Sequence, residues 1–168
     1  MKTEIIGMAL CIALLFGAGR SSAEELIYPT QDAPLFTITM PEKWKSDIIE
    51  ETILQAISPD EKVYMMAWPV DAETIEEAAD AIDEFLSDVL TELTMTEKAD
   101  TPTINGIPFW QNTGSGKDVE SDDDVNITAD LFSPDGKTVC LLVFLTEPKA
   151  GKAHQEEMTT IVHSIKRP

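Results

Sequence analysis

The sequence predicts an α+β protein in which an antiparallel β-sheet is sandwiched by helices. Three observations lead to this fold class. Several short runs alternate apolar and polar residues, which is the period of strands with one buried face. Turn-forming residues of the kind that close hairpins separate these runs. Two longer segments instead repeat apolar residues every three or four positions, as helices do.

Residues 1–23 have the pattern of a secretory signal peptide. An unbroken apolar run, residues 5–18, follows Lys2 and leads to small residues that end at Ala23. Because a permanent membrane helix needs roughly 20 residues, we expect cleavage after Ala23 and export to the periplasm or beyond. An uncleaved N-terminal anchor is the alternative. Cleavage would leave residues 24–168 as a single domain with no stable membrane anchor.

The first strands are expected before residue 70. Residues 35–40 alternate apolar and polar side chains and are followed by a proline. Residues 52–57 and 62–68 form a predicted hairpin, because residues 58–61 have the sequence SPDE, which favours a turn. Pro69 is expected to end the second strand of this hairpin.

A long helix is predicted from residue 72 to residue 94. Thr74 and Glu77 have the spacing of a capping box at its start. Its apolar residues recur at helical spacing and define one buried face: Ile75, Ala78, Ala79, Ile82, Phe85, Leu86, Val89, Leu90 and Leu93.

Strands return after this helix. Residues 101–104 and 107–110 flank Asn105 and Gly106, a pair that favours a tight hairpin because both residues tolerate positive φ. Another strand is predicted over residues 125–132.

The last strand and the last helix complete the fold. Residues 137–146 are apolar at consecutive positions, which indicates a central strand covered on both faces by helices. Met158, Ile161, Val162 and Ile165 then share one face of a terminal helix.

The chain is strongly acidic. It has 31 acidic and 12 basic residues and a net charge of −19, which becomes −20 when Lys2, Glu4 and Arg20 leave with the leader. Such a charge disfavours binding to nucleic acid and to anionic lipid, and it favours cations or a basic protein partner. Solubility alone is the simpler explanation.

Acidic residues crowd the segment 118–124. The candidate cation ligands are Asp118, Glu120, Asp122, Asp123 and Asp124. A twelve-residue calcium loop needs Gly at position 6 and Glu at position 12, where this chain has Asp123 and Ala129. We therefore expect a long solvated loop between strands that end near Gln111 and begin near Val125. Weak binding of Ca²⁺ or another divalent cation is the alternative.

The outer side of the long helix is acidic as well. The candidate partner-binding residues are Glu76, Glu77, Asp80, Asp83 and Glu84. Like charges three and four residues apart repel one another. This surface is therefore either a solvated helix face or a docking surface for a cationic partner.

Catalytic residues are not predicted. The chain has no HExxH, GxSxG, GxxxxGK[ST] or CxxC motif. His154 and His163 are nine residues apart and therefore lie on opposite sides of a helix. Cys140 lies in a predicted buried strand and is expected to be inert. No cofactor is expected, and a hydrolase that uses carboxylates we cannot identify is the weakest alternative.

The order of these parts resembles the PsbP and DcrB-like group of exported proteins. The resemblance rests on Pro41 and Trp44 after the first strand, the SPD turns, the Asn105–Gly106 hairpin and the SPDGK turn at residues 133–137. It implies a PsbP-like α/β/α sandwich in an accessory or binding protein without catalysis. No cysteine stands at the cleavage point, so the lipid anchor of the lipoprotein relatives is not expected.

Our leading interpretation is a non-catalytic exported accessory or binding protein that contacts a protein partner through an acidic surface. The alternative is a divalent-cation-binding protein that uses residues 118–124. Titration with calcium and manganese separates the two, since only the second predicts stabilisation by the ion.

Overall fold

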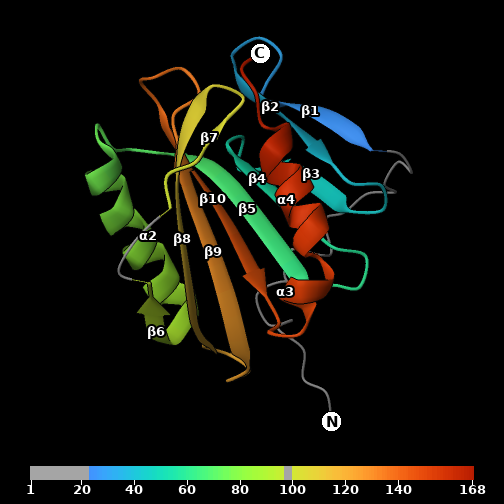
Figure 1. The fold of residues 1–168 in the computed structure, drawn as a ribbon, viewed down its shortest axis with the longest axis vertical. Coiled ribbons are helices and arrows are strands. Elements are labelled where there is room, and N and C mark those ends of the chain that lie inside the picture. The colour runs from blue at the N-terminus through green and yellow to red at the C-terminus, as the bar shows by residue number, and fades with distance from the viewer. Residues whose placement is uncertain (1–22, 97–99) are drawn as a thin grey trace.

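A large antiparallel sheet organises the computed structural model, which describes residues 23–96 and 100–168 (Figure 1). The predicted leader, residues 1–23, lies outside the described part of the chain except for Ala23. The elements are β1 (Glu24–Pro29), β2 (Pro34–Met40), β3 (Lys45–Ile49), β4 (Ile53–Ile57), β5 (Val63–Val70), α2 (Ile75–Val89), β6 (Leu90–Met95), β7 (Thr103–Ile104), β8 (Ile107–Asp118), β9 (Asp124–Phe132), β10 (Val139–Thr146), α3 (Ala150–Ala153) and α4 (Gln155–Ser164).

The main sheet has the strand order β3-β4-β5-β10-β9-β8-β6, with β7 paired to β8. Each of its strand pairs is antiparallel. β10 lies at the centre, and all of its residues are buried. Leu142 of β10 lies opposite Ala67 of β5 and Asp130 of β9. The predicted central strand with two covered faces is therefore confirmed.

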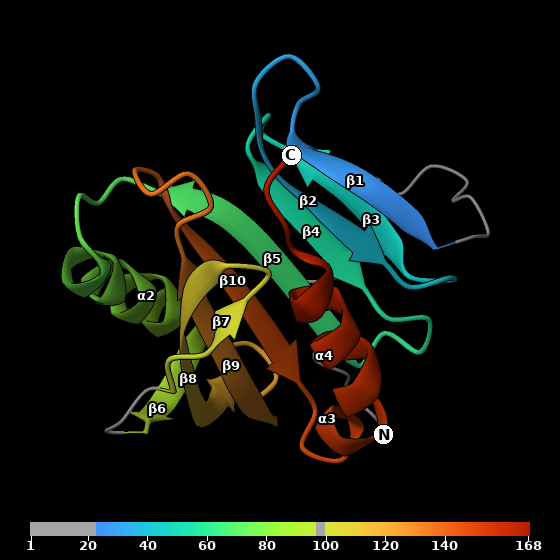
Figure 2. The same ribbon diagram turned by 45° about the horizontal axis from the view of Figure 1, so that its top comes forward.

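Two apolar layers cover the sheet, one on each face. Figure 2 shows α2 on one side of the sheet, and α4 with the β1–β2 sheet on the other. Leu141 and Val143 of β10 face the layer that contains α2. Leu142 and Phe144 face the other layer, which contains α4 and the two-stranded β1–β2 sheet. The structure confirms the predicted fold class, an antiparallel sheet with helices on both faces. The β1–β2 sheet is an addition that the sequence pattern did not predict.

The long helix is shorter than predicted. It starts at Ile75, three residues later than predicted, but the predicted Thr74 cap is confirmed, because the Thr74 hydroxyl accepts a 3.2 Å hydrogen bond from the Glu77 N–H. It ends at Val89, and the chain from Leu90 to Met95 continues as β6. Leu90 has extended backbone angles and pairs with Asp118 of β8. The apolar residues of this segment are compatible with either a helix or a strand, and pairing with β8 makes it a strand.

The predicted long loop before residue 125 is also wrong, since β8 runs to Asp118 and only a short turn precedes β9. Two glycines let β6 lie close against β8. A Cβ at Gly114 would lie 2.5 Å from the Thr94 carbonyl oxygen, and one at Gly116 would lie 3.0 Å from that of Thr91. Both glycines lie in the segment that was predicted as a loop, and they serve the packing of a strand.

Two further strands, β1 and β3, were missed, and β5 was also predicted too short. β1 pairs with β2, and β3 forms an edge of the main sheet by pairing with β4. β5 continues through Pro69 to Val70, with Pro69 opposite Cys140. A proline near the end of a strand costs few ladder hydrogen bonds, so it does not stop the pairing.

The predicted tight hairpin at Asn105 and Gly106 is confirmed, and both residues have positive φ, 51° and 76°. The Asn105 side-chain N–H group donates 2.8 Å hydrogen bonds to the carbonyl oxygens of His163 and Ile165. The hairpin thereby fixes the end of α4 against the sheet. Among the described residues, no helix has the length and apolar character needed to cross a membrane.

Candidate functional site

The acidic side of α2 is a continuous exposed surface. Its five predicted partner-binding residues, Glu76, Glu77, Asp80, Asp83 and Glu84, are all exposed. Within the described residues, none of these carboxylates forms an ion pair with a basic side chain. The Glu77 carboxylate accepts a hydrogen bond from the Glu73 N–H at the start of the helix. The structure thus brings the predicted group together on one element.

The acidic segment 118–124 is a tight turn between β8 and β9. Asp118 is buried, and its Oδ1 atom accepts hydrogen bonds of 3.0 Å and 2.8 Å from the N–H groups of Glu120 and Ser121. Lys117 Nζ lies 3.3 Å from Asp124 Oδ1. Two of the predicted cation ligands therefore have other partners in the turn.

The remaining predicted cation ligands are spread around the same turn. Glu120, Asp122 and Asp124 are exposed, and Asp123 is half-buried. In the part of the chain that the structure describes, no three His, Cys, Asp or Glu side chains are grouped so that they could hold a metal ion. Cation binding by this turn stays a prediction.

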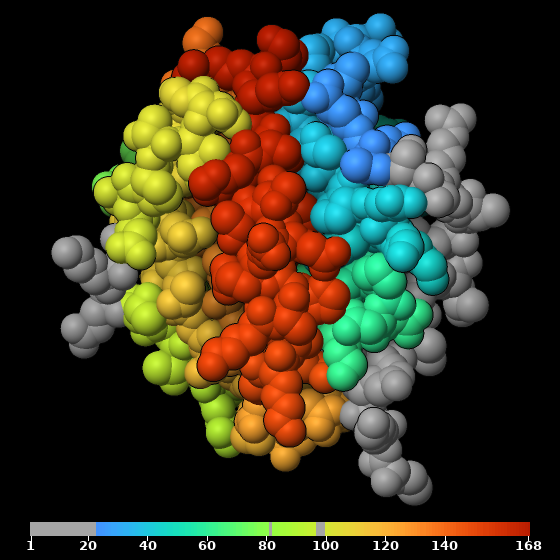
Figure 3. Space-filling model, turned by 45° about the vertical axis from the view of Figure 1, so that its right-hand side comes forward, coloured from blue at the N-terminus to red at the C-terminus, as the bar shows by residue number. Residues whose placement is uncertain are grey.

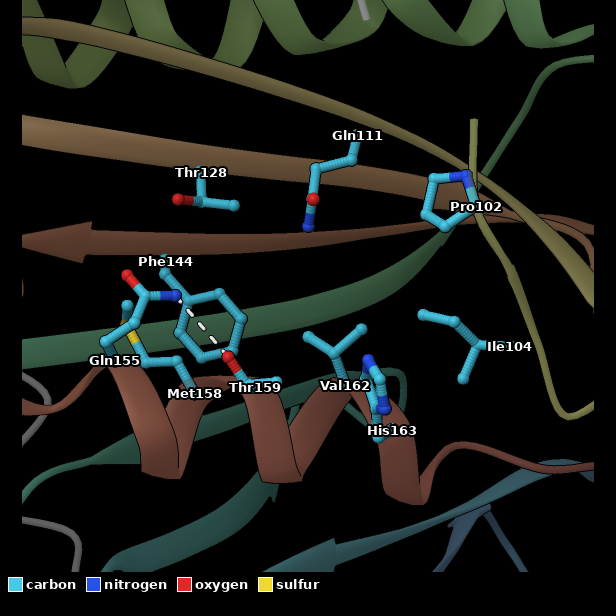
Figure 4. Close-up of a pocket in the computed structure, with 10 residues that line it drawn as sticks. All are labelled: Pro102, Ile104, Gln111, Thr128, Phe144, Gln155, Met158, Thr159, Val162 and His163. Carbon is cyan, nitrogen blue, oxygen red and sulfur yellow. Dashed lines mark hydrogen bonds between the residues drawn. The ribbon is translucent and has the colours of Figure 1, made fainter. Parts of the chain in front are cut away.

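A groove lies between α4 and the sheet. In the space-filling view, α4 runs down the middle of the surface with the β7–β8 hairpin on one side (Figure 3). The groove has a volume of about 200 Å³. Its lining is drawn in Figure 4: Pro102, Ile104, Gln111, Thr128, Phe144, Gln155, Met158, Thr159, Val162 and His163.

The groove is lined by groups that can form hydrogen bonds, among them the imidazole of His163. Amide and hydroxyl groups lie beside an apolar floor, and Gln155 donates a 3.4 Å hydrogen bond to Thr159 (Figure 4). No carboxylate or thiol is among the lining groups. Ligand sites commonly have roughly 300–1,000 Å³, so this groove fits one side chain or a few waters.

Asp130 is a fully buried carboxyl beside this groove. It lies on the same face of β9 as Thr128, which lines the groove, because alternate residues of a strand share a face. Gln111 Nε2 donates a 2.7 Å hydrogen bond to Asp130 Oδ1. Asp130 Oδ2 has no hydrogen-bond partner within the described residues. Burial raises the pKa of Asp130 to about 7, against the lowering effect of the Gln111 hydrogen bond.

Asp130 was not among the residues predicted from the sequence. The available signal was its position, because a carboxylate at an inward-facing place in a strand next to the central one must be buried. Cys140, by contrast, behaves as expected. Its side chain is buried, and burial raises the pKa of its thiol to about 12, so the thiolate form is disfavoured at neutral pH.

His154 joins the start of α4 to the β4–β5 turn. Its Nδ1 atom lies 2.5 Å from Glu157 Oε2, and its Nε2 atom lies 3.1 Å from Asp60 Oδ2. Burial lowers the pKa of His154, but the hydrogen bonds to both carboxylates and their charges outweigh it, so the pKa lies above its ordinary value. Both ring nitrogens can donate only when the imidazole is protonated.

We expect His154→Gln to destabilise the protein by about 1 kcal/mol at low pH. A raised folded-state pKa gives a contribution that is complete below the unfolded pKa of 6.5 and is lost as the pH rises through the folded value. Urea unfolding at pH 5.5 and pH 8.5 measures this, and the loss should be larger at pH 5.5. His163→Gln, an exposed change on the same helix, is the control. Equal losses at both pH values would contradict the expectation.

Comparison with solved structures identifies a PsbP-like fold. The cyanobacterial PsbP (CyanoP) of Synechocystis has a TM-score of 0.62 at 12% identity, over 90% of this chain and 96% of that one. LpqN of Mycobacterium tuberculosis is described as involved in cell envelope biogenesis. It has a TM-score of 0.56 at 11% identity, over 94% of this chain and 97% of that one. PA94 of Pseudomonas aeruginosa is a protein of unknown function described as a putative regulator. It has a TM-score of 0.53 at 14% identity, over 86% of this chain and 99% of that one.

The likeness is one of fold. No protein-family model matches this sequence, and no curated protein is significantly similar to it. The similar structures are thus PsbP-like and cell-envelope proteins of unknown or regulatory role.

Proposed function

We propose that this protein is a non-catalytic accessory protein, exported to the cell envelope, that binds a basic protein partner through the acidic outer face of α2. The observation that carries the proposal is the set of five exposed carboxylates on one helix, none with a basic partner among the described residues. Similar folds with envelope or regulatory descriptions support the accessory role.

Repulsion between the carboxylates of α2 favours the binding of a cationic partner. Glu76 and Asp80 are four residues apart, as are Asp80 and Glu84, so each pair repels on the helix surface. A cationic partner would relieve this repulsion and would be attracted over a distance of about one Debye length. Binding should therefore weaken as salt is raised. The cation-binding alternative at residues 118–124 predicts instead that calcium raises the melting temperature.

Affinity capture from an envelope fraction tests the proposal. The test variant replaces the five acids of α2 with their amides, Glu76→Gln, Glu77→Gln, Asp80→Asn, Asp83→Asn and Glu84→Gln. The control variant makes the same change at five exposed acids elsewhere, Asp32, Glu50, Glu51, Glu61 and Glu120. We expect the captured partner to fall about tenfold with the first variant only. Equal capture by both variants would exclude the α2 face.

A further inference from the structure

A second hollow lies beside α2, on the part of the sheet that α2 leaves open. α2 packs mainly against β6, β9 and β10. Next to it, the cleft has about 320 Å³ and is lined by Ile53, Met66, Trp68, Glu84, Phe85 and Asp88. The Trp68 and Phe85 rings meet edge to face with centroids 4.9 Å apart. Ile53, Trp68 and Phe85 are each only partly buried, so the floor offers apolar surface to a ligand.

The edge of this cleft is negatively charged. Glu84 and Asp88 line it, and Asp80 and Glu77 precede Glu84 by four and seven residues. At about 100° per residue, these four side chains lie within about 80° of one another and form a stripe about 16 Å long. All four are exposed. None of the residues that line the cleft is basic.

We propose that this cleft, together with its acidic stripe, binds an amphipathic basic segment of a partner protein. The segment would place apolar side chains against Trp68 and Phe85, and lysine or arginine side chains along the stripe from Glu77 to Asp88. This inference rests on the proposed function and adds the class of partner. A purely basic segment would leave the apolar floor of the cleft exposed to solvent. A purely apolar or acidic segment would leave the carboxylates without a cationic partner.

The helical periodicity of the stripe gives the partner a matching pattern. Its carboxylates recur every three or four residues, which is the spacing of one face of a second helix. A partner helix with basic residues at that spacing, and leucine or similar residues beside them, could contact the acidic stripe and the apolar cleft together. Trp68 can in addition accept a cation over its ring.

Designed peptides test this inference on the purified protein. The probe is a fluorescently labelled peptide of leucine and lysine that forms a helix with one apolar face. One control peptide has serine in place of leucine, and the other has glutamate in place of lysine. We expect the leucine–lysine peptide to bind about tenfold or more tightly than either control, as measured by fluorescence anisotropy.

Paired variants of α2 locate the binding surface. Glu84→Gln with Asp88→Asn should weaken binding of the leucine–lysine peptide at least about fivefold. Asp32→Asn with Glu156→Gln makes the same charge change at exposed acids outside α2, and should leave binding within about twofold. Trp68→Gln should also weaken binding. These acids are exposed, so the charge variants decide the question even if Trp68→Gln fails to fold.

The outcomes separate this inference from the proposed function. If the leucine–lysine and serine–lysine peptides bound equally well, and Glu84→Gln with Asp88→Asn weakened both, the apolar cleft would be overturned and a basic partner on α2 would remain. Failure of both lysine peptides to bind would overturn both proposals. Self-association of the protein without any peptide, if it were lost in Trp68→Gln, would make the cleft an interface between copies, and would also overturn the inference.

Discussion

Asp130→Asn is expected to make the protein less sensitive to alkaline pH. The folded protein has an Asp130 pKa of about 7, compared with an ordinary value of 3.8. A carboxyl whose folded-state pKa is raised contributes stability that is complete below the unfolded pKa and is lost as the pH rises through the folded value. Between the two values, only the folded protein holds the proton. Ionisation of Asp130 should therefore cost about 3 kcal/mol of unfolding free energy between pH 5 and pH 8.

The physical cause is the surroundings of this carboxyl. Asp130 Oδ1 has one donor, Gln111, while Oδ2 has none within the described residues, so the charged form is poorly solvated. Asparagine has the same shape and cannot ionise. We expect the unfolding free energy of the variant, relative to that of the wild type, to increase by about 3 kcal/mol as the pH rises from 5 to 8.

Urea unfolding at several pH values measures this effect. Asp32→Asn is the matched control, because Asp32 is exposed and the change removes the same charge. It should leave the pH dependence close to that of the wild type. If Asp130→Asn and Asp32→Asn gave the same dependence on pH, Asp130 would not carry the proton that we assign to it.

Phe132→Ala should produce the largest loss of stability, about 3–5 kcal/mol. Phe132 is fully buried on the α4 side of the sheet. Its ring centroid lies 4.8 Å from that of Phe109 in a stacked arrangement, and 5.2 Å from that of Phe36 in an edge-to-face one. It thus joins β9 to β8 and to the β1–β2 sheet. Alanine leaves a cavity that these three elements cannot close together.

Chemical denaturation gives the unfolding free energy for this test. Phe132→Leu should cost less because it keeps most of the volume. Val119→Ala, at a side chain that is 47% exposed, should change stability by no more than about 0.5 kcal/mol. A loss below about 1 kcal/mol for Phe132→Ala would show that the β1–β2 sheet does not depend on this ring.

Periodicity predicted most of the architecture because local burial patterns reflect it directly. The consecutive apolar residues of β10 indicated a central strand, and each of its residues is indeed buried. Asn105 and Gly106 predicted a hairpin because their conformational freedom is a local property, and the turn is present. The Thr74 cap was predictable for the same reason.

The errors occur where a distant partner decides the local structure. Leu90 and Leu93 fit the helix pattern, yet pairing with β8 makes this segment a strand. Gly114 and Gly116 fall in the segment predicted as a loop, whereas in the structure they allow β6 to approach β8. Neither result can be derived from neighbouring residues, because the paired residues of β6 and β8 are 19 to 28 positions apart along the chain.

The candidate sites show the same contrast between local sequence and distant partners. The chain alone revealed the acidity of α2, since charge is a property of composition and the helical repeat places these acids on one side. Only the folded structure put Trp68 of β5 against Phe85 of α2, and Asp130 beside Gln111 and the groove under α4. Solvation and pairing depend on groups that are distant in sequence, so burial, pKa and the shape of a cleft emerge only when the sheet and its two layers have assembled.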